Sequence, residues 1–175
     1  YIFSMKLLII FIYLITINFC QAFEKPDFKN LVLIKNPKLY EDVIFKNINQ
    51  KNVNLTDFKG NLIILNFWAT WCAPCKEEMP SLDSLQSNSK LNNLKIFPIN
   101  IGQEDAPKTE FFFKELNIQN LQIYFDAPIT LAKKFSLRGL PTTIIFNKEG
   151  KEFARIIGSI DFNDEEFIDW LKLYN

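Results

Sequence analysis

Apolar and polar positions alternate along the chain in a way that predicts short strands and helices. Residues 62–68 (L-I-I-L-N-F-W) form a continuous apolar run rich in β-branched and aromatic residues, typical of a strand buried on both faces. In residues 76–86, Met79, Leu82 and Leu85 are spaced for one apolar face of a helix. The pattern therefore predicts a buried strand that leads into an amphipathic helix.

The rest of the pattern predicts an α/β fold in which strands and helices alternate. We expect two short strands within 43–55, further strands at 94–101, 121–125, 142–146 and 152–157, and helices at 107–116, 129–135 and 163–173. Asp161 or Asn163 is expected to cap the last helix. Pro80 is expected to kink the helix at 76–86 without ending it.

Two cysteines lie where the buried strand meets the helix. Cys72 and Cys75 are separated by Ala73 and Pro74, and Trp71 precedes them. The free N–H groups and the dipole of a helix N-terminus favour a thiolate at this position. We therefore expect the pair to make or break disulfides, with Cys72 as the exposed nucleophile and Cys75 as the resolving thiol.

A structural zinc site is the main alternative for a CxxC pair. Such a site needs four ligands, normally two CxxC pairs or one pair with histidines. The chain has no histidine, and its third cysteine, Cys20, lies in the N-terminal apolar segment. Redox chemistry is therefore the stronger interpretation. The expected redox group is the Cys72–Cys75 disulfide itself, with no metal and no further cofactor.

Two segments resemble the thioredoxin superfamily, and most of all its TlpA/ResA/CcmG-like thiol–disulfide oxidoreductases. They are residues 67–75 (F-W-A-T-W-C-A-P-C) and 139–143 (G-L-P-T-T), within a similarity that covers about residues 45–173. The resemblance implies a thioredoxin-like α/β fold with an N-terminal β-hairpin extension and a central helix–strand insertion. It also implies that Pro141 follows a cis peptide bond and faces the cysteine pair, with the Leu140 backbone turned to the substrate.

Within this resemblance, two positions concern proton transfer to the buried thiol. Thioredoxins have an aspartate in the strand where this chain has Asn66, which does not titrate. ResA-like proteins have a glutamate three residues after the second cysteine, and Glu78 occupies that place. The i, i+3 offset puts Glu78 on the helix face of Cys75, so that proton exchange between them is geometrically possible. The alternative is that Glu77 and Glu78 are exposed acids, which a helix N-terminus favours.

Substrate docking is expected around the cysteine pair and the proline segment. The expected docking residues are Trp71, Ala73, Pro74 and Leu140. The backbone beside Leu140 and Pro141 is expected to pair with an extended substrate segment by strand addition. Trp71 is expected to shield the pair and shape the docking face, and a packing role is its alternative.

The N-terminus resembles a secretory signal. Lys6 precedes about 13 apolar positions at 7–19, and Ala22 ends a small-residue exit, so we expect export and cleavage after Ala22. An uncleaved anchor is the alternative, although 13 apolar residues are short for a bilayer span. We thus expect a signal peptide or anchor, an N-terminal extension and a thioredoxin-like domain, at residues 1–22, 23–44 and 45–175.

Composition limits the classes of partner. The 175 residues include 20 basic and 20 acidic side chains without a basic cluster, which argues against nucleic-acid binding. Export would place the dithiol in the periplasm, where disulfides persist. The resemblance implies protein disulfides as substrates, in cytochrome c maturation or copper-oxidase assembly, and a membrane electron donor that re-reduces the pair.

Two other functions are open at this point. A thiol peroxidase of the AhpC/TSA class would need the pattern P-x-x-x-T-x-x-C, but Thr70 stands at the wrong offset from Cys72 and the proline is missing. A non-catalytic module, either a holdase or a Cu(I) carrier with both thiolates as soft ligands, is the second alternative. Copper chaperones of the Sco type use CxxxC and a distant histidine, which this chain lacks.

Overall fold

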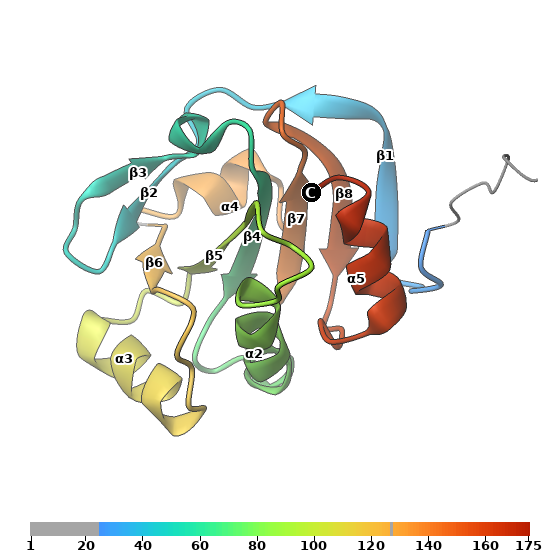
Figure 1. The fold of residues 1–175 in the computed structure, drawn as a ribbon. Helices are drawn as coiled ribbons and strands as arrows, with labels where there is room; N and C mark the ends of the chain where they lie inside the picture. The colour runs from blue at the N-terminus through green and yellow to red at the C-terminus, as the bar shows by residue number, and fades with distance from the viewer. Residues whose placement is uncertain (1–24, 127) are drawn as a thin grey trace, which may run out of the picture.

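The buried strand predicted at residues 62–68 is β4 (Leu62–Trp68), in the interior of an eight-stranded sheet (Figure 1). The computed structural model describes residues 25–126 and 128–175. All seven residues of β4 are buried, because β7 and β5 flank it and helices cover both faces of the sheet. The expected signal segment, with Cys20, lies outside the described residues.

The elements follow the predicted alternation. The other strands are β1 (Leu31–Leu39), β2 (Ile44–Asn47), β3 (Asn52–Asn54), β5 (Leu94–Asn100), β6 (Tyr124–Phe125), β7 (Thr142–Phe146) and β8 (Lys151–Ile157). The helices are the 3-10 helix η1 (Leu55–Phe58) and the α-helices α2 (Ala73–Gln86), α3 (Ala106–Glu115), α4 (Thr130–Lys134) and α5 (Glu165–Lys172). No helix in the described part of the chain is both long and apolar enough to cross a bilayer.

The sheet is mixed, with the order β1-β8-β7-β4-β5-β6-β2-β3. β4 pairs parallel with β5, and β5 pairs parallel with β6. The carboxyl ends of these three strands therefore lie at one edge of the sheet. β7 runs antiparallel to β4, so its amino end reaches the same edge.

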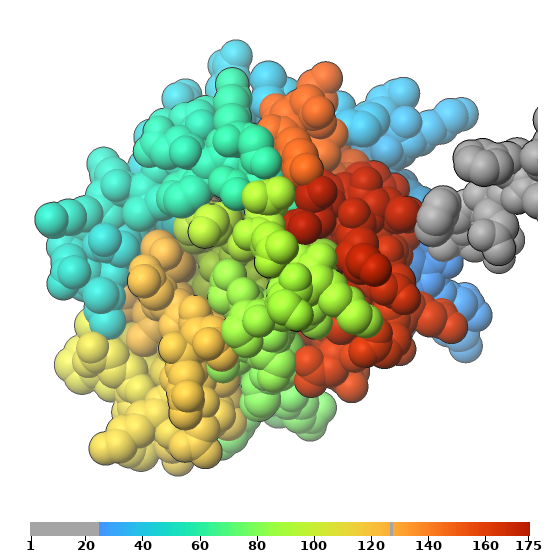
Figure 2. All heavy atoms as spheres, viewed as in Figure 1, coloured from blue at the N-terminus to red at the C-terminus, as the bar shows by residue number. Residues whose placement is uncertain are grey.

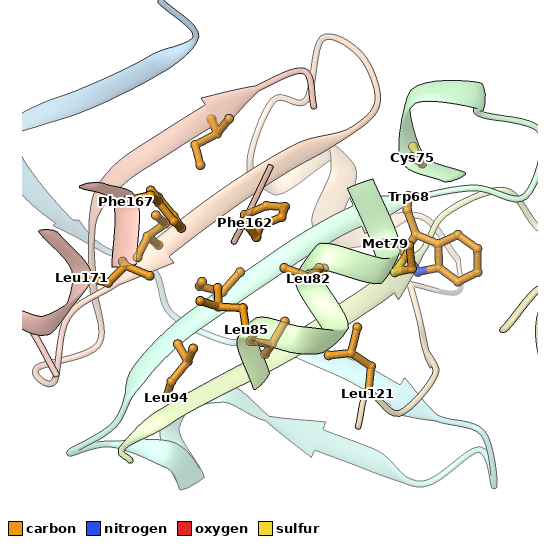
Figure 3. Packing of buried hydrophobic residues seen from close by; sticks show 14 of the residues in the cluster. Trp68, Cys75, Met79, Leu82, Leu85, Leu94, Leu121, Phe162, Phe167 and Leu171 are labelled. Carbon is orange, nitrogen blue, oxygen red and sulfur yellow. The ribbon is translucent and has the colours of Figure 1, made fainter. Parts of the chain in front are cut away.

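Two apolar clusters fill the space on either side of the sheet. One lies under α2, α3 and α5, and the other lies under α4 and beside the β2–β3 hairpin. Met79, Leu82 and Leu85 point from α2 toward the sheet, as their spacing predicted (Figure 3). On the surface, α2 and the loop after it fill the middle of one face, between α3 and α5 (Figure 2).

Several sequence predictions need correction at the element level. The N-terminal extension predicted at residues 23–44, for which no strand was expected, contains β1, an edge strand that pairs antiparallel with β8 and is largely exposed. Only Tyr124 and Phe125 of the strand predicted at 121–125 are in β6. The cap of α5 is Asp164, which accepts a hydrogen bond from the Phe167 N–H, and is neither Asp161 nor Asn163. The β2–β3 hairpin is confirmed, and α2 continues past Pro80.

Candidate active site

The two cysteines lie at the N-terminus of α2 and form a disulfide, with 5.3 Å between their Cα atoms. Cys72 is the N-cap residue, and its Sγ accepts a hydrogen bond from the Cys75 N–H at 3.3 Å. Pro74 lies in the first turn of the helix, where its missing N–H has no intrahelical partner to lose. The same N–H groups and helix dipole favour a thiolate at Cys72 after reduction.

The expectation of an exposed Cys72 is wrong for this state. Its exposed fraction is 5%, and that of Cys75 is zero, because both pack in the apolar cluster under α2. The flanking Trp71, Ala73 and Pro74 are exposed instead, and Trp71 keeps 68% of its surface. Trp71 is therefore not a core residue.

The peptide bond between Leu140 and Pro141 is cis, as the resemblance implied. The register of β7 pairs Thr142 with Phe67, which places the residue before Thr142 near the end of β4. The Pro141 carbonyl accepts a hydrogen bond from the Gly158 N–H at 2.9 Å. Among the described residues, neither the N–H nor the C=O of Leu140 has a hydrogen-bond partner.

Glu78 is buried, so its interpretation as an exposed acid is wrong, although Glu77 is exposed. Glu78 Oε1 accepts a hydrogen bond from Asn66 Nδ2 at 2.8 Å, and Oε2 accepts one from the Ile160 N–H at 3.4 Å. Burial raises the pKa of Glu78 to about 8, against these two hydrogen bonds, which lower it. At this pKa the carboxyl can both take up and release a proton near neutral pH.

Sequence reasoning treated Asn66 only as a group that does not titrate, and missed what it contacts. Its Nδ2 donates to Glu78 and, at 3.0 Å, to the Thr143 hydroxyl. Its Oδ1 is buried and has no hydrogen-bond partner in the described part of the chain. Asn66 thus joins the strand β4 and the helix α2 through the carboxyl of Glu78. An amide at this strand position and an acid at the i+3 helix position are the sequence signal for the pair.

The described residues hold no group of three or more His, Cys, Asp or Glu side chains that could bind a metal ion. The sulfur atoms of Cys72 and Cys75 are bonded to each other. The arrangement can take up two electrons at the disulfide and exchange a proton at Glu78.

Comparison with known proteins identifies relatives of this chain. The family model described as AhpC/TSA family matches residues 35–151. A protein from Bacillus subtilis (strain 168), named thiol-disulfide oxidoreductase ResA, is 31% identical over 117 residues, which cover 67% of this chain and 64% of that relative. A ResA protein from Bacillus thuringiensis subsp. konkukian is 29% identical over 129 residues, 74% of this chain and 72% of that relative. These similarities confirm the predicted relationship to ResA-like proteins.

Solved structures confirm the fold. The exposed lipoprotein thioredoxin Etrx1 from Streptococcus pneumoniae superimposes with a TM-score of 0.61 at 24% identity, over 75% of this chain and 97% of that structure. A DsbF homologue from Corynebacterium diphtheriae gives a TM-score of 0.68 at 21% identity, over 85% and 96% of the two chains. The described residues therefore have a thioredoxin-like fold.

Proposed function

This chain belongs to the AhpC/TSA family, and we propose that it catalyses thiol–disulfide exchange through Cys72 and Cys75. The observation that carries the proposal is the disulfide-bonded CxxC pair at the N-cap of α2. A helix N-terminus stabilises the thiolate, which is the nucleophile in exchange. In the proposed direction of electron flow, the disulfide-bonded pair is the product of substrate reduction.

The proposed reaction takes place in two exchanges at sulfur. In the reduced protein, the Cys72 thiolate attacks one sulfur of a substrate disulfide and releases the other sulfur as a thiolate. The Cys75 thiolate then attacks Cys72 Sγ, releases the second substrate thiolate and forms the Cys72–Cys75 disulfide. Two electrons thus pass from the dithiol to the substrate, and the pair must be re-reduced before another turnover.

Glu78 is the proposed proton acceptor for Cys75. Cys75 is fully buried, so its thiol needs a nearby base to become a nucleophile. Glu78 lies one helical turn further along α2, and its pKa of about 8 is close to the ordinary value for a thiol. Glu78→Gln is expected to slow resolution by about tenfold, at the low end of the effect of removing a general base.

Docking is proposed at the unpaired Leu140 backbone. An extended substrate segment can hydrogen-bond to the Leu140 N–H and C=O, as in strand addition. The exposed Trp71, Ala73 and Pro74 then offer an uncharged surface around the disulfide. Because these contacts are to backbone and apolar atoms, they suit unfolded or extended protein segments of varied sequence.

The physiological role proposed is reduction of protein disulfides outside the cytoplasm, in cytochrome c maturation or copper-oxidase assembly. The resemblance to the TlpA/ResA/CcmG-like branch and the signal-like residues 1–22 support this compartment. The absence of charge and of histidine between Cys72 and Cys75 supports a reductant over a strong oxidant. Re-reduction is assigned to a membrane electron donor.

Peroxidase chemistry is the alternative that the family name raises. Counted back from Cys72, the threonine and proline positions of P-x-x-x-T-x-x-C are Ala69 and Leu65. Both residues are buried and apolar, so they offer no hydroxyl to a peroxide at those positions. Exchange is therefore the better supported function.

A trapping experiment tests the proposal. Cys75→Ser, expressed in the native envelope, is expected to stay disulfide-linked through Cys72 to its substrate, and mass spectrometry then identifies the adduct. Cys72→Ser is the matched control and should trap nothing. Capture of an apocytochrome or a copper-assembly protein would decide between the two pathways. An empty trap together with peroxide turnover by the unaltered protein would overturn the exchange function.

A further inference from the structure

A half-buried acid in the loop after β5 holds the segment that leads into Cys72. Glu104 Oε1 accepts hydrogen bonds from the Thr70 N–H at 3.2 Å and from the Thr70 hydroxyl at 2.6 Å. Thr70 is the second residue of a turn that the Cys72 N–H closes by donating to the Ala69 carbonyl at 3.2 Å. One carboxylate oxygen therefore fixes both the backbone and the side chain of this turn.

The other carboxylate oxygen is fixed to the sheet. Glu104 Oε2 accepts a hydrogen bond at 2.7 Å from Nδ2 of the buried Asn100, and Asn100 Oδ1 accepts one from the Gly102 N–H at 3.0 Å. Asn100 ends β5 and pairs with Trp68, the last residue of β4. Glu104 thus joins the turn to the same strand pair from which the turn departs.

Gly102 leaves the space that the carboxylate occupies. A Cβ atom at this position would lie 2.5 Å from the Glu104 Cδ, far inside van der Waals contact. Any other residue at 102 would therefore displace the Glu104 carboxylate. This gives a way to move the carboxylate without removing its charge.

We propose that Glu104 is a positioning residue that holds Cys72 at the N-cap of α2 through Thr70. Cys72 follows Thr70 by two residues, and its Sγ receives the Cys75 N–H only while it stays at that cap. Attack on a disulfide requires alignment of three sulfur atoms, and a displacement of about 1 Å can lower such rates by about 100-fold. The inference rests on the proposed exchange reaction, in which Cys72 is the attacking thiolate.

If Glu104 acts by positioning, its removal changes the pKa of Cys72 in one direction. If it acts only through its negative charge, the pKa changes in the opposite direction. If Glu104 acted only as a nearby negative charge, its removal would favour the thiolate and lower the pKa of Cys72. If Glu104 acts by positioning, its removal releases Cys72 from the helix N-terminus, and the pKa of Cys72 rises. Lys76, Glu77 and Glu78, the charged groups nearest to Cys72 along α2, are the same in every variant compared.

The test measures alkylation of reduced full-length protein by iodoacetamide as a function of pH, resolved at the Cys72 peptide by mass spectrometry. Glu104→Ala is expected to raise the pKa of Cys72 and to slow reduction of a disulfide-bonded protein by about tenfold. Glu104→Gln retains an oxygen that can accept from Thr70, so it is expected to restore the rate to within about threefold. Gly102→Ala is expected to behave like Glu104→Ala, although the charge remains.

Coupling and controls complete the test. Thr70→Val removes the hydroxyl donor, and its effect in the Glu104→Ala background is expected to be much smaller than in the unaltered protein, because both changes break the same contact. Glu110→Ala, an exposed charge removal on α3, should change neither measurement. Urea unfolding shows that each variant is folded under the assay conditions.

Two results would overturn the inference. One is a pKa of Cys72 that falls equally in Glu104→Ala and Glu104→Gln, and the other is a pKa that stays unchanged in both. Alkylation needs no substrate disulfide. If the unaltered protein failed to exchange disulfides, the proposed function would fail, and the alkylation profiles would still decide whether Glu104 positions Cys72.

Discussion

Two buried acids on α2, five residues apart, differ in how the protein surrounds them. Asp83 accepts hydrogen bonds from the backbone N–H groups of three consecutive residues, 119–121, at 2.7–3.3 Å, and from Asn120 Nδ2 at 2.9 Å. Glu78 has two donors, one of them at 3.4 Å. Both side chains are less than 10% exposed. The two acids are both buried and differ in the number of donors that surround them.

This difference assigns the two acids separate roles. Hydrogen bonds stabilise the charged form of a carboxylate, whereas burial without them favours the neutral form. The four donors make Asp83 an anchor that ties α2 to the loop before β6. Glu78, with few donors and a pKa of about 8, is suited to carry a proton beside the cysteine pair. The same helix therefore carries one carboxylate with a structural role and one that is the proposed proton acceptor for Cys75.

The largest expected effect comes from removing the anchor. Asp83→Ala is expected to lower the free energy of unfolding by about 4 kcal/mol, because three backbone N–H groups lose their acceptor in a partly buried loop. Urea unfolding of the oxidised protein measures this loss. Asp169→Ala, an exposed change on α5, should cost no more than about 0.5 kcal/mol.

The comparison also requires that Asp83 take no part in the exchange reaction. Asp83→Asn keeps one accepting oxygen, and its exchange rate per folded molecule should stay within about twofold of the unaltered protein. An exchange rate that fell as far as in Glu78→Gln would show that the anchor, and not the proton, governs the site.

An effect of similar size is expected in the pH dependence of stability. The pKa of Glu78 is about 8 in the folded protein against an ordinary 4.5, so the unfolded chain releases this proton at lower pH than the folded protein does. Stability from this group is therefore present below about pH 4.5 and is lost as pH rises to about 8. Between pH 4.5 and 9 this difference in pKa corresponds to a loss of about 4 kcal/mol. Urea unfolding between pH 4.5 and 9 measures it.

Glu78→Gln is the control for this pH dependence, because the amide is neutral at every pH. The difference in unfolding free energy between the two proteins isolates Glu78 from all other titrating groups. The difference should change in favour of Glu78→Gln as pH rises. Parallel curves would mean that Glu78 is ionised throughout, as a well-solvated or fully hydrogen-bonded acid would be.

Sequence patterns predicted the parts of this molecule that local rules determine. The buried run at 62–68, the helix spacing of Met79, Leu82 and Leu85, and the cysteine pair at the helix start all follow from periodicity and capping. β1 was missed because an edge strand lacks the alternation that burial imposes, and its pairing with β8 joins residues more than a hundred positions apart. Such pairing depends on the assembled sheet.

At the site, too, the sequence predicted the contacts within one helix but not those between residues far apart in the chain. The helical offset placed Glu78 near Cys75, but its burial depends on Asn66 from β4 and on the Ile160 backbone. The contact between Glu104 and Thr70 spans 34 positions and forms only once β4 and β5 have paired. Local spacing could not indicate either set of partners.

The smallest expected effect tests how Asn66 changes the pKa of Glu78. Asn66→Leu keeps a similar volume and removes the Nδ2 donor that lowers the pKa of Glu78, so this pKa should rise further. It also removes the buried, unpaired Oδ1, so the free energy of unfolding should change by less than about 1 kcal/mol. At pH 7 a smaller fraction of Glu78 is ionised, and the exchange rate should fall about threefold.

The measurement for Asn66→Leu is the pH profile of the exchange rate, and in particular the part of that profile that disappears in Glu78→Gln. Asn66→Leu should move this part to higher pH. Thr143→Val removes the other partner of the Asn66 amide and leaves the bond to Glu78, so its shift should be smaller. A profile that stayed in place, or that moved to lower pH, would show that the hydrogen bond from Asn66 does not lower the pKa of Glu78. The low number of donors would then not explain why Glu78 differs from Asp83.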